Sequence, residues 1–170
     1  FSYLIRIGTI PVRLGHTVLN TECYLCERAE GKHPRGFDVW FWAGEPPNAF
    51  HAKLLRRCLT IDRTGFARIV QLCNNLFVGW DLFHPQSEQL DRDIHNLLEK
   101  HPTHLRLTAA EDEHGWREMG RWGVPKGAKF VCFIVRDAAY LPQLAYHSYR
   151  DVDVDTYSDA CMDLVLRGYY

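Results

Sequence analysis

Strand-like and helix-like segments alternate along this chain, and their order is the strongest constraint on its fold. Short apolar or aromatic runs at residues 3–7, 37–42 and 130–135 have the length of buried strands. Between the first two lies a segment, residues 16–30, whose apolar side chains recur at helical spacing. A strand–helix–strand order is typical of parallel sheets, because the helix carries the chain back to the edge where it started. We therefore predict an α/β fold, a Rossmann-like parallel sheet flanked by helices.

Further helices are expected in the rest of the chain, and they cover residues 48–59, 65–77, 92–100, 108–122 and a last segment that ends at Gly168. Thr108 and Glu111 have the spacing of a capping box, in which each side chain binds the other's backbone N–H. Gly123 and Pro125 then follow in the order that ends a helix. Residues 78–89 show no pattern that predicts an element.

The composition excludes several classes of partner. A net charge of −1 gives no field that would attract nucleic acid. The longest apolar run is far shorter than the roughly 20 residues that span a bilayer, and no signal-peptide pattern is visible. The six cysteines lie among apolar neighbours, as free thiols do in a reducing compartment. We expect a cytoplasmic protein, with the inner face of the membrane as an alternative location.

Both ends of the sequence read as positions inside a longer protein. The chain opens on Phe1 and runs directly into an apolar segment, and it closes on Gly168, Tyr169 and Tyr170, where a βαβ series would begin its next strand. We therefore expect a missing C-terminal half. The expected division is a first domain at residues 1–124 and the start of a second domain at residues 125–170.

The segment with the most candidate ligand-binding side chains follows the apolar run at residues 130–135. In open parallel sheets, ligands bind beyond the carboxyl ends of the strands. Arg136 would place a guanidinium there, and guanidinium suits bidentate contact with phosphate. The loop that follows is rich in aromatic and short polar side chains, which suit recognition of a sugar or a base. The candidate residues for binding such a ligand are Arg136, Tyr140, Tyr146, Ser148, Tyr149 and Arg150.

Structural explanations for the same segment stay open. Arg136 and Asp137 can form an ion pair at the end of a strand. Asp153 or Asp155 can cap the last helix, which accounts for the acidic cluster without any ligand. The two aspartates also spell a metal-binding Asp-x-Asp, but their position before a helix favours the cap.

The loop between the first strand and the first helix is a second candidate site. Arg13, Gly15, His16 and Asn20 stand at the start of a helix, whose N-terminus attracts anions. A plain connection between strand and helix is the alternative. The sequence has no dinucleotide-binding Gly-x-Gly-x-x-Gly and no P-loop lysine pattern.

No metal or cofactor is expected from the sequence. Cys23 and Cys26 form a Cys-x-x-Cys, but they lie within a predicted helix and no second ligand pair follows at zinc-finger spacing. His101 and His104 are separated by a proline, which makes a poor ligand scaffold. We interpret the two cysteines as helix-packing residues.

Three segments carry a family resemblance. Phe130-Val-Cys-Phe-Ile-Val-Arg-Asp-Ala-Ala-Tyr-Leu141, with Tyr146-His-Ser-Tyr-Arg-Asp-Val-Asp-Val-Asp-Thr-Tyr157, resembles a bacterial family of glycosyltransferases linked to surface-polysaccharide assembly. Arg13-Leu-Gly-His-Thr-Val-Leu-Asn-Thr-Glu22 is similar to the opening loop and first helix of that family. The resemblance implies a GT-B architecture, in which two Rossmann-like domains face each other and a nucleotide-sugar donor binds mainly to the second.

The resemblance also implies roles for individual residues. By a looser likeness to fucosyltransferases, Arg136 would contact the donor phosphates, although Ile134 stands where a histidine is expected. The acceptor hydroxyl would lose its proton to His16, Asp137 or His147. The expected partners are a nucleotide-sugar donor and a glycan acceptor, with no bound metal. Two alternatives stay open, namely a non-catalytic carbohydrate- or nucleotide-binding module and an unrelated α/β domain that acts through protein interaction.

Overall fold

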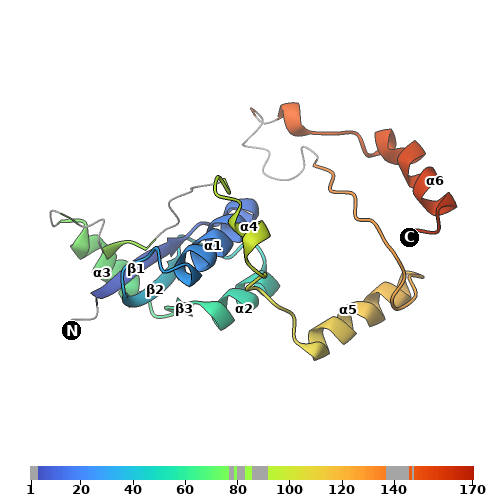
Figure 1. The fold of residues 1–170 in the computed structure, drawn as a ribbon. Coiled ribbons are helices and arrows are strands. Elements are labelled where there is room, and N and C mark those ends of the chain that lie inside the picture. Colours follow the sequence, from blue (N-terminus) through green and yellow to red (C-terminus); the bar gives the residue numbers. More distant parts are fainter. Residues whose placement is uncertain (1–3, 77–78, 80–82, 86–91, 137–145, 147) are drawn as a thin grey trace. The chain divides into compact units, whose positions relative to one another are not determined.

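The computed structural model describes residues 4–76, 79, 83–85, 92–136, 146 and 148–170. The chain divides into two compact units, Phe1–Leu107 and Thr108–Tyr170 (Figure 1). Each unit has its own set of helices and its own internal contacts. The sequence-based division at residue 124 stays a prediction. No helix within the described residues is both long and apolar enough to cross a membrane.

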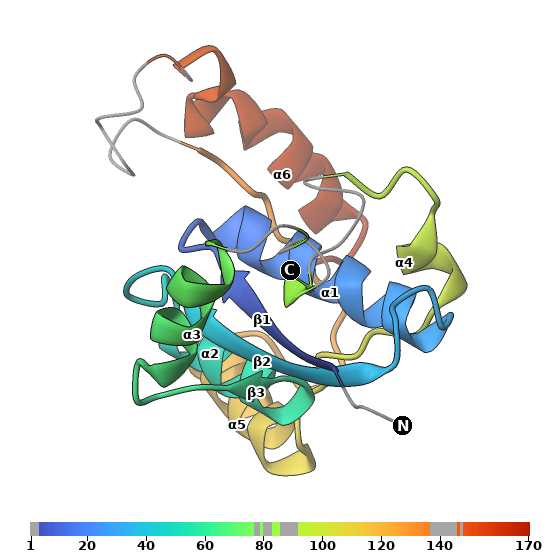
Figure 2. The same cartoon turned by 90° about the vertical axis from the view of Figure 1, so that its left-hand side faces the viewer.

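The first unit is built on a three-stranded parallel sheet with the order β1-β2-β3 (Figure 2). β1 (Leu4–Ile10) and β2 (Gly36–Trp42) pair along their whole length, whereas β3 (Thr60–Ile61) adds a short edge. Consecutive parallel strands in this order are compatible with one half of a Rossmann-like sheet. The predicted α/β fold with a parallel sheet is confirmed.

Among the described residues of the first unit, four α-helices accompany the sheet, and they are α1 (Leu14–Ala29), α2 (Ala49–Cys58), α3 (Phe66–Asn74) and α4 (Leu97–Lys100). The side chain of Asn48 caps α2 by accepting a hydrogen bond from a backbone N–H of the first turn. α3 packs on β1 and β2, where the Thr9 hydroxyl donates to Gln71 Oε1 over 3.0 Å. α4 lies against α1 (Figures 1 and 2).

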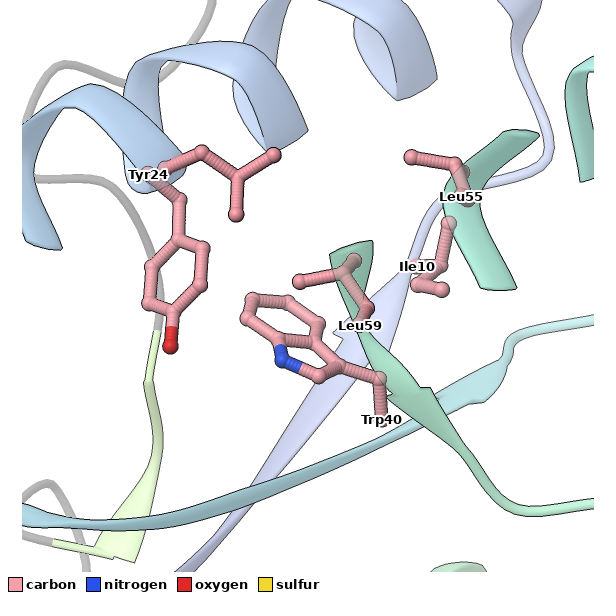
Figure 3. Packing of buried hydrophobic residues seen from close by; sticks show 6 residues of the cluster. Ile10, Tyr24, Trp40, Leu55 and Leu59 are labelled. Carbon is pink, nitrogen blue, oxygen red and sulfur yellow. The ribbon is translucent and has the colours of Figure 1, made fainter. Parts of the chain in front are cut away.

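The apolar core lies between the sheet and helices α1 and α2. The rings of Tyr24 and Trp40 meet edge to face with their centroids 4.7 Å apart (Figure 3). This geometry favours aromatic pairs because the positive ring edge meets the negative ring face. The buried members of the core are Ile10, Tyr24, Leu25, Trp40, Leu55 and Leu59.

A charged network is buried beside this core. Arg6 on β1 donates two hydrogen bonds of 2.6 Å to the carboxylate of Asp38, its register partner on β2. The hydroxyl of Tyr24 on α1 donates to the same carboxylate, and burial together with this bond raises the pKa of Tyr24. The guanidinium of Arg28 lies 3.8 Å from Asp38 Oδ2 at the exposed side of the network. One carboxylate therefore ties two strands and a helix together.

The second unit contains α5 (Ala109–Arg121), the 3₁₀ helix η3 (Val154–Tyr157) and α6 (Ser158–Leu166). The predicted capping box at the start of α5 is present, with both hydrogen bonds between Thr108 and Glu111. The Asp153 side chain accepts from the backbone N–H of Asp155 and thereby caps η3, which leads directly into α6. The predicted aspartate cap is thus found one element earlier, because α6 itself begins after Tyr157 with no side-chain cap.

The predicted buried strand at residues 130–135 is wrong. The segment has no strand assignment, and Phe130, Val131 and Ile134 are exposed, Ile134 with 93% of its surface. Its described pairing consists of Tyr170 N donating to the Lys129 carbonyl and Val131 N donating to the Tyr170 carbonyl. These two bonds alternate as in a parallel ladder, but one bridge does not make a strand.

Several predicted boundaries also need correction. β1 continues past Gly8 to Ile10, and the short β3 was missed because Thr60–Ile61 falls within a polar connection. The helix predicted at residues 92–100 is confined to its last turn, Leu97–Lys100. The other helices lie where the pattern places them, within a few residues at each end.

Replacing Gly8 by alanine should destabilise the first unit. A Cβ at this position would lie 2.5 Å from Trp40 Cε3, so the indole or the strand must move. We expect a loss of about 1–3 kcal/mol in the free energy of unfolding, measured by urea denaturation. Gly15→Ala is the matched control, because its Cβ would meet no atom of the described residues within 4 Å. Equal stabilities for the two variants would contradict the packing argument.

Asp38→Asn should destabilise the chain more strongly, because it leaves the buried Arg6 guanidinium without a countercharge. Removing one partner of a buried pair costs about 3–5 kcal/mol, whereas replacing both partners by apolar side chains is often close to neutral. The double variant Arg6→Met, Asp38→Leu should therefore unfold at a higher urea concentration than Asp38→Asn. The reverse order would show that the pair itself is the main stabilising contribution.

Candidate functional site

A cavity of about 400 Å³ lies on the outer side of α1, between this helix and the segment that contains α4. Its volume falls within the range of small-molecule sites, and its walls are mainly apolar with a few polar groups. The lining residues are Gly15, Val18, Leu19, Glu22, Leu98, His101 and Thr103.

His101, which lines this cavity, is held by two charged side chains. Its Nε2 lies 3.0 Å from Glu30 Oε1, and Lys32 Nζ lies 2.7 Å from Glu30 Oε2. The hydrogen bond from Lys32, followed by that from His101, lowers the pKa of Glu30 to about 2. Glu30 is therefore ionised at any physiological pH, and its carboxylate holds the Lys32 ammonium and the His101 imidazole.

Glu22 connects the cavity to a buried cluster behind it. Glu22 and Cys26 lie one turn apart on α1, and both are buried. The Oε1 atom of Glu22 accepts from His104 N over 2.7 Å and lies 2.9 Å from His104 Nδ1. Cys26 Sγ lies 4.0 Å from the same Nδ1 atom. A carboxylate, a thiol and an imidazole thus converge within 4.8 Å of one another.

The two cysteines of α1 are weak nucleophiles. Burial, and after it the carboxylates of Asp93 and Glu22 among others, raises the pKa of Cys23 and of Cys26 to about 11. Both thiols are therefore protonated near neutral pH in the metal-free protein, which makes them poor nucleophiles. They are free cysteines, not a disulfide.

In the second unit, Arg136 forms an ion pair that was not predicted. Its Nε lies 3.2 Å from Asp151 Oδ1, and its carbonyl accepts from Val152 N over 3.0 Å. Arg136 and Asp151 are each partly accessible to solvent. The guanidinium is thereby held beside the loop that follows residue 145, while its remaining N–H groups can still donate.

The other predicted donor-site residues are surface residues. Tyr146 and Tyr149 are exposed, and Ser148 and Arg150 lie with Tyr149 in a short 3₁₀ turn at residues 148–150. Three predicted residues lie outside the described residues, and they are Asp137, Tyr140 and His147. Of the predicted set, the structure therefore describes Arg136, Tyr146, Ser148, Tyr149 and Arg150.

The predicted residues of the first loop are distributed around the start of α1. Gly15 lines the cavity, whereas the exposed Arg13 precedes the helix without a side-chain cap. His16 and Asn20 are half-buried residues of α1. The expected helix N-terminus is present, and it is adjacent to the cavity through Gly15.

Sequence reasoning missed Glu22, His101 and His104 as site residues. A signal for Glu22 and Cys26 was available, since residues four apart on a helix share a face. His104 had no such signal, because it lies 82 positions beyond Glu22 in the sequence and reaches it only through the tertiary fold.

The chain matches no protein-family model, no curated protein and no solved structure.

Cysteine accessibility tests the description of α1. In the folded protein at pH 8, iodoacetamide should modify the exposed Cys73 and Cys132 much faster than Cys23 and Cys26, as read by peptide mass spectrometry. Raising the pH toward 11 should increase modification of the two buried cysteines, because their thiolate fraction rises only there. The same reaction in urea serves as the control and should remove the difference. Equal rates in the folded protein at pH 8 would contradict the burial of these thiols.

Proposed function

We propose that this chain belongs to a glycosyltransferase of GT-B type, which transfers a sugar from a nucleotide-sugar donor to a glycan acceptor in bacterial surface-polysaccharide synthesis. The observation that carries the proposal is the position of Arg136, a partly buried guanidinium fixed at the end of an apolar segment and beside a loop rich in tyrosine. The proposal places the donor on the second unit and the acceptor on the first, in the cytoplasm.

The energetics of Arg136 support a role in donor binding. A partly exposed ion pair contributes only about 0–1 kcal/mol to stability. Asp151 therefore orients the Arg136 guanidinium but leaves other N–H groups of the guanidinium available to a ligand. A hydrogen bond to a charged group contributes roughly 1.5–3 kcal/mol, and a diphosphate offers several acceptors. The donor can therefore compete with Asp151 for Arg136. Neutralising the leaving diphosphate is the main electrostatic demand of glycosyl transfer.

The aromatic side chains near Arg136 support recognition of the rest of the donor. Tyr146 and Tyr149 expose 65% and 77% of their surfaces. Exposed tyrosine offers a flat apolar face and a hydroxyl, which suit a base or a sugar ring. Arg150 brings a second guanidinium into the same turn as Tyr149. Tyr140 as a donor contact, and Asp137 and His147 as alternative general bases, are proposed on the basis of the sequence.

The cavity beside α1 supports an acceptor site on the first unit. It has the volume of a small-molecule site and offers hydrogen-bonding groups from Glu22, His101 and Thr103. Gly15 joins it to the loop that contains Arg13, and His16 follows directly as the described candidate for the general base. Asn20 is assigned to the same acceptor side. The proposed transfer step uses no metal and no cofactor.

Calorimetric titration of the full-length protein with UDP-, GDP-, CMP- and dTDP-sugars tests the proposal. One donor should bind saturably, and Arg136→Ala should weaken that donor by about tenfold or more, because a charge-assisted contact to phosphate is lost. Arg167→Ala is the matched control, since it removes an exposed arginine that pairs with Asp163 on α6 of the same unit.

The remaining outcomes separate the alternatives. Asp151→Asn should preserve or strengthen donor binding, because it frees the guanidinium of Arg136. Binding that survives Arg136→Ala unchanged would remove this residue from the donor site. If none of the four donors binds, the non-catalytic carbohydrate-binding module becomes the better description, and Ile134 in place of the expected histidine is consistent with it.

A further inference from the structure

The cluster of Glu22, Cys26 and His104 has the composition and spacing of a metal site. Two of its members come from one face of α1, and the third comes from the segment after α4, so the fold brings together residues that are 82 positions apart. The candidate ligand atoms are a carboxylate oxygen, the Cys26 thiol sulfur and His104 Nδ1, all within 4.8 Å of one another.

The second observation is an unsatisfied oxygen. Glu22 exposes only 7% of its surface, and its Oε1 accepts from His104 N, with His104 Nδ1 also within hydrogen-bond distance. Its other oxygen, Oε2, is buried and has no hydrogen-bond partner among the residues that the structure describes. A buried carboxylate oxygen without a partner is unfavourable, because burial removes its hydrogen bonds to water and no protein group replaces them. A cation bound to the Glu22 carboxylate would compensate for this loss.

The geometry selects the class of cation. A tetrahedral zinc ion with bonds of about 2.0–2.3 Å separates its nitrogen and sulfur ligands by about 3.5 Å. Cys26 Sγ and His104 Nδ1 are 4.0 Å apart, so only a small adjustment is needed. A thiolate, an imidazole and a carboxylate together favour zinc over calcium or magnesium, which take oxygen ligands.

Negatively charged side chains surround the cluster, and the neighbouring cavity offers a route to it from solvent. The carboxylates of Glu27, Glu30 and Asp93 all act on Cys26, and their field attracts a cation. His33 Nε2 lies 3.1 Å from Glu27 Oε2, and the Lys32 ammonium and His101 contact Glu30, so Lys32 partly offsets the field from the outer side. Glu22 also lines the cavity, which provides a route from solvent to the cluster.

We propose that Glu22, Cys26 and His104 bind one zinc ion, which fastens α1 to the segment that follows α4. Three protein ligands leave the fourth tetrahedral position to water or to a group in the neighbouring cavity. The site goes beyond the proposed sugar transfer and does not depend on it. It also differs from the expectation of no metal that the Cys-x-x-Cys spacing gave, since Cys23 is not one of the ligands.

Cobalt and zinc titrations of the metal-stripped full-length protein test this site. The wild type should bind one Co²⁺ per chain with the charge-transfer absorption of a cobalt–thiolate bond, and Zn²⁺ should displace it. Cys26→Ser should abolish that absorption and weaken Zn²⁺ binding by more than about 100-fold, the upper range for residues that merely support a ligand. His104→Asn keeps a polar side chain near Glu22 and should also lose tight binding.

Cys23→Ser is the matched control, because Cys23 is buried on the same helix and shares most of the same charged neighbours. It should retain the absorption and the affinity. Circular dichroism on every variant establishes that a loss of binding is not a loss of fold. A folded wild type without the cobalt–thiolate absorption, or a folded Cys26→Ser that retains it, would overturn the proposal. So would a Cys23→Ser variant that is folded and loses binding.

Discussion

The carboxylate of Asp38 is the interaction on which the first unit depends. It accepts hydrogen bonds from Arg6 on β1 and from Tyr24 on α1, while its own strand is the centre of the sheet. A shift of one residue between β1 and β2 would turn one of the two charged side chains to the opposite face. Since a buried charge without a partner is very unfavourable, the network specifies the register as well as the position of α1.

The two faces of α1 contribute to different parts of the first unit. Tyr24 and Leu25 close the apolar core above the sheet, while Gly15 and Glu22 contribute to the cavity on its outer side. The inner face is held by the network around Asp38, so the outer face is presented on a rigid support. A binding surface on a rigid element keeps its geometry better than one on a loop.

The sequence predicted local features well and long-range ones poorly. The caps at Asn48 and Thr108 were predictable because a cap involves residues only a few positions apart. The buried strand predicted at residues 130–135 was wrong, because a continuous apolar segment indicates burial but does not identify the residues that would cover it. The pairing of Glu22 with His104 left no trace in the sequence, since it depends on where the segment after α4 returns to α1.

The spacing of Arg6 and Asp38 has a consequence for how the chain folds. The two residues are 32 positions apart, and all of α1 lies between them. The chain must therefore close a long loop before β1 and β2 can pair, and loop closure slows the formation of non-local contacts. Because Arg6 and Tyr24 bind the same buried carboxylate, we expect the first β–α–β segment to form in one concerted step, with few half-assembled species along the way.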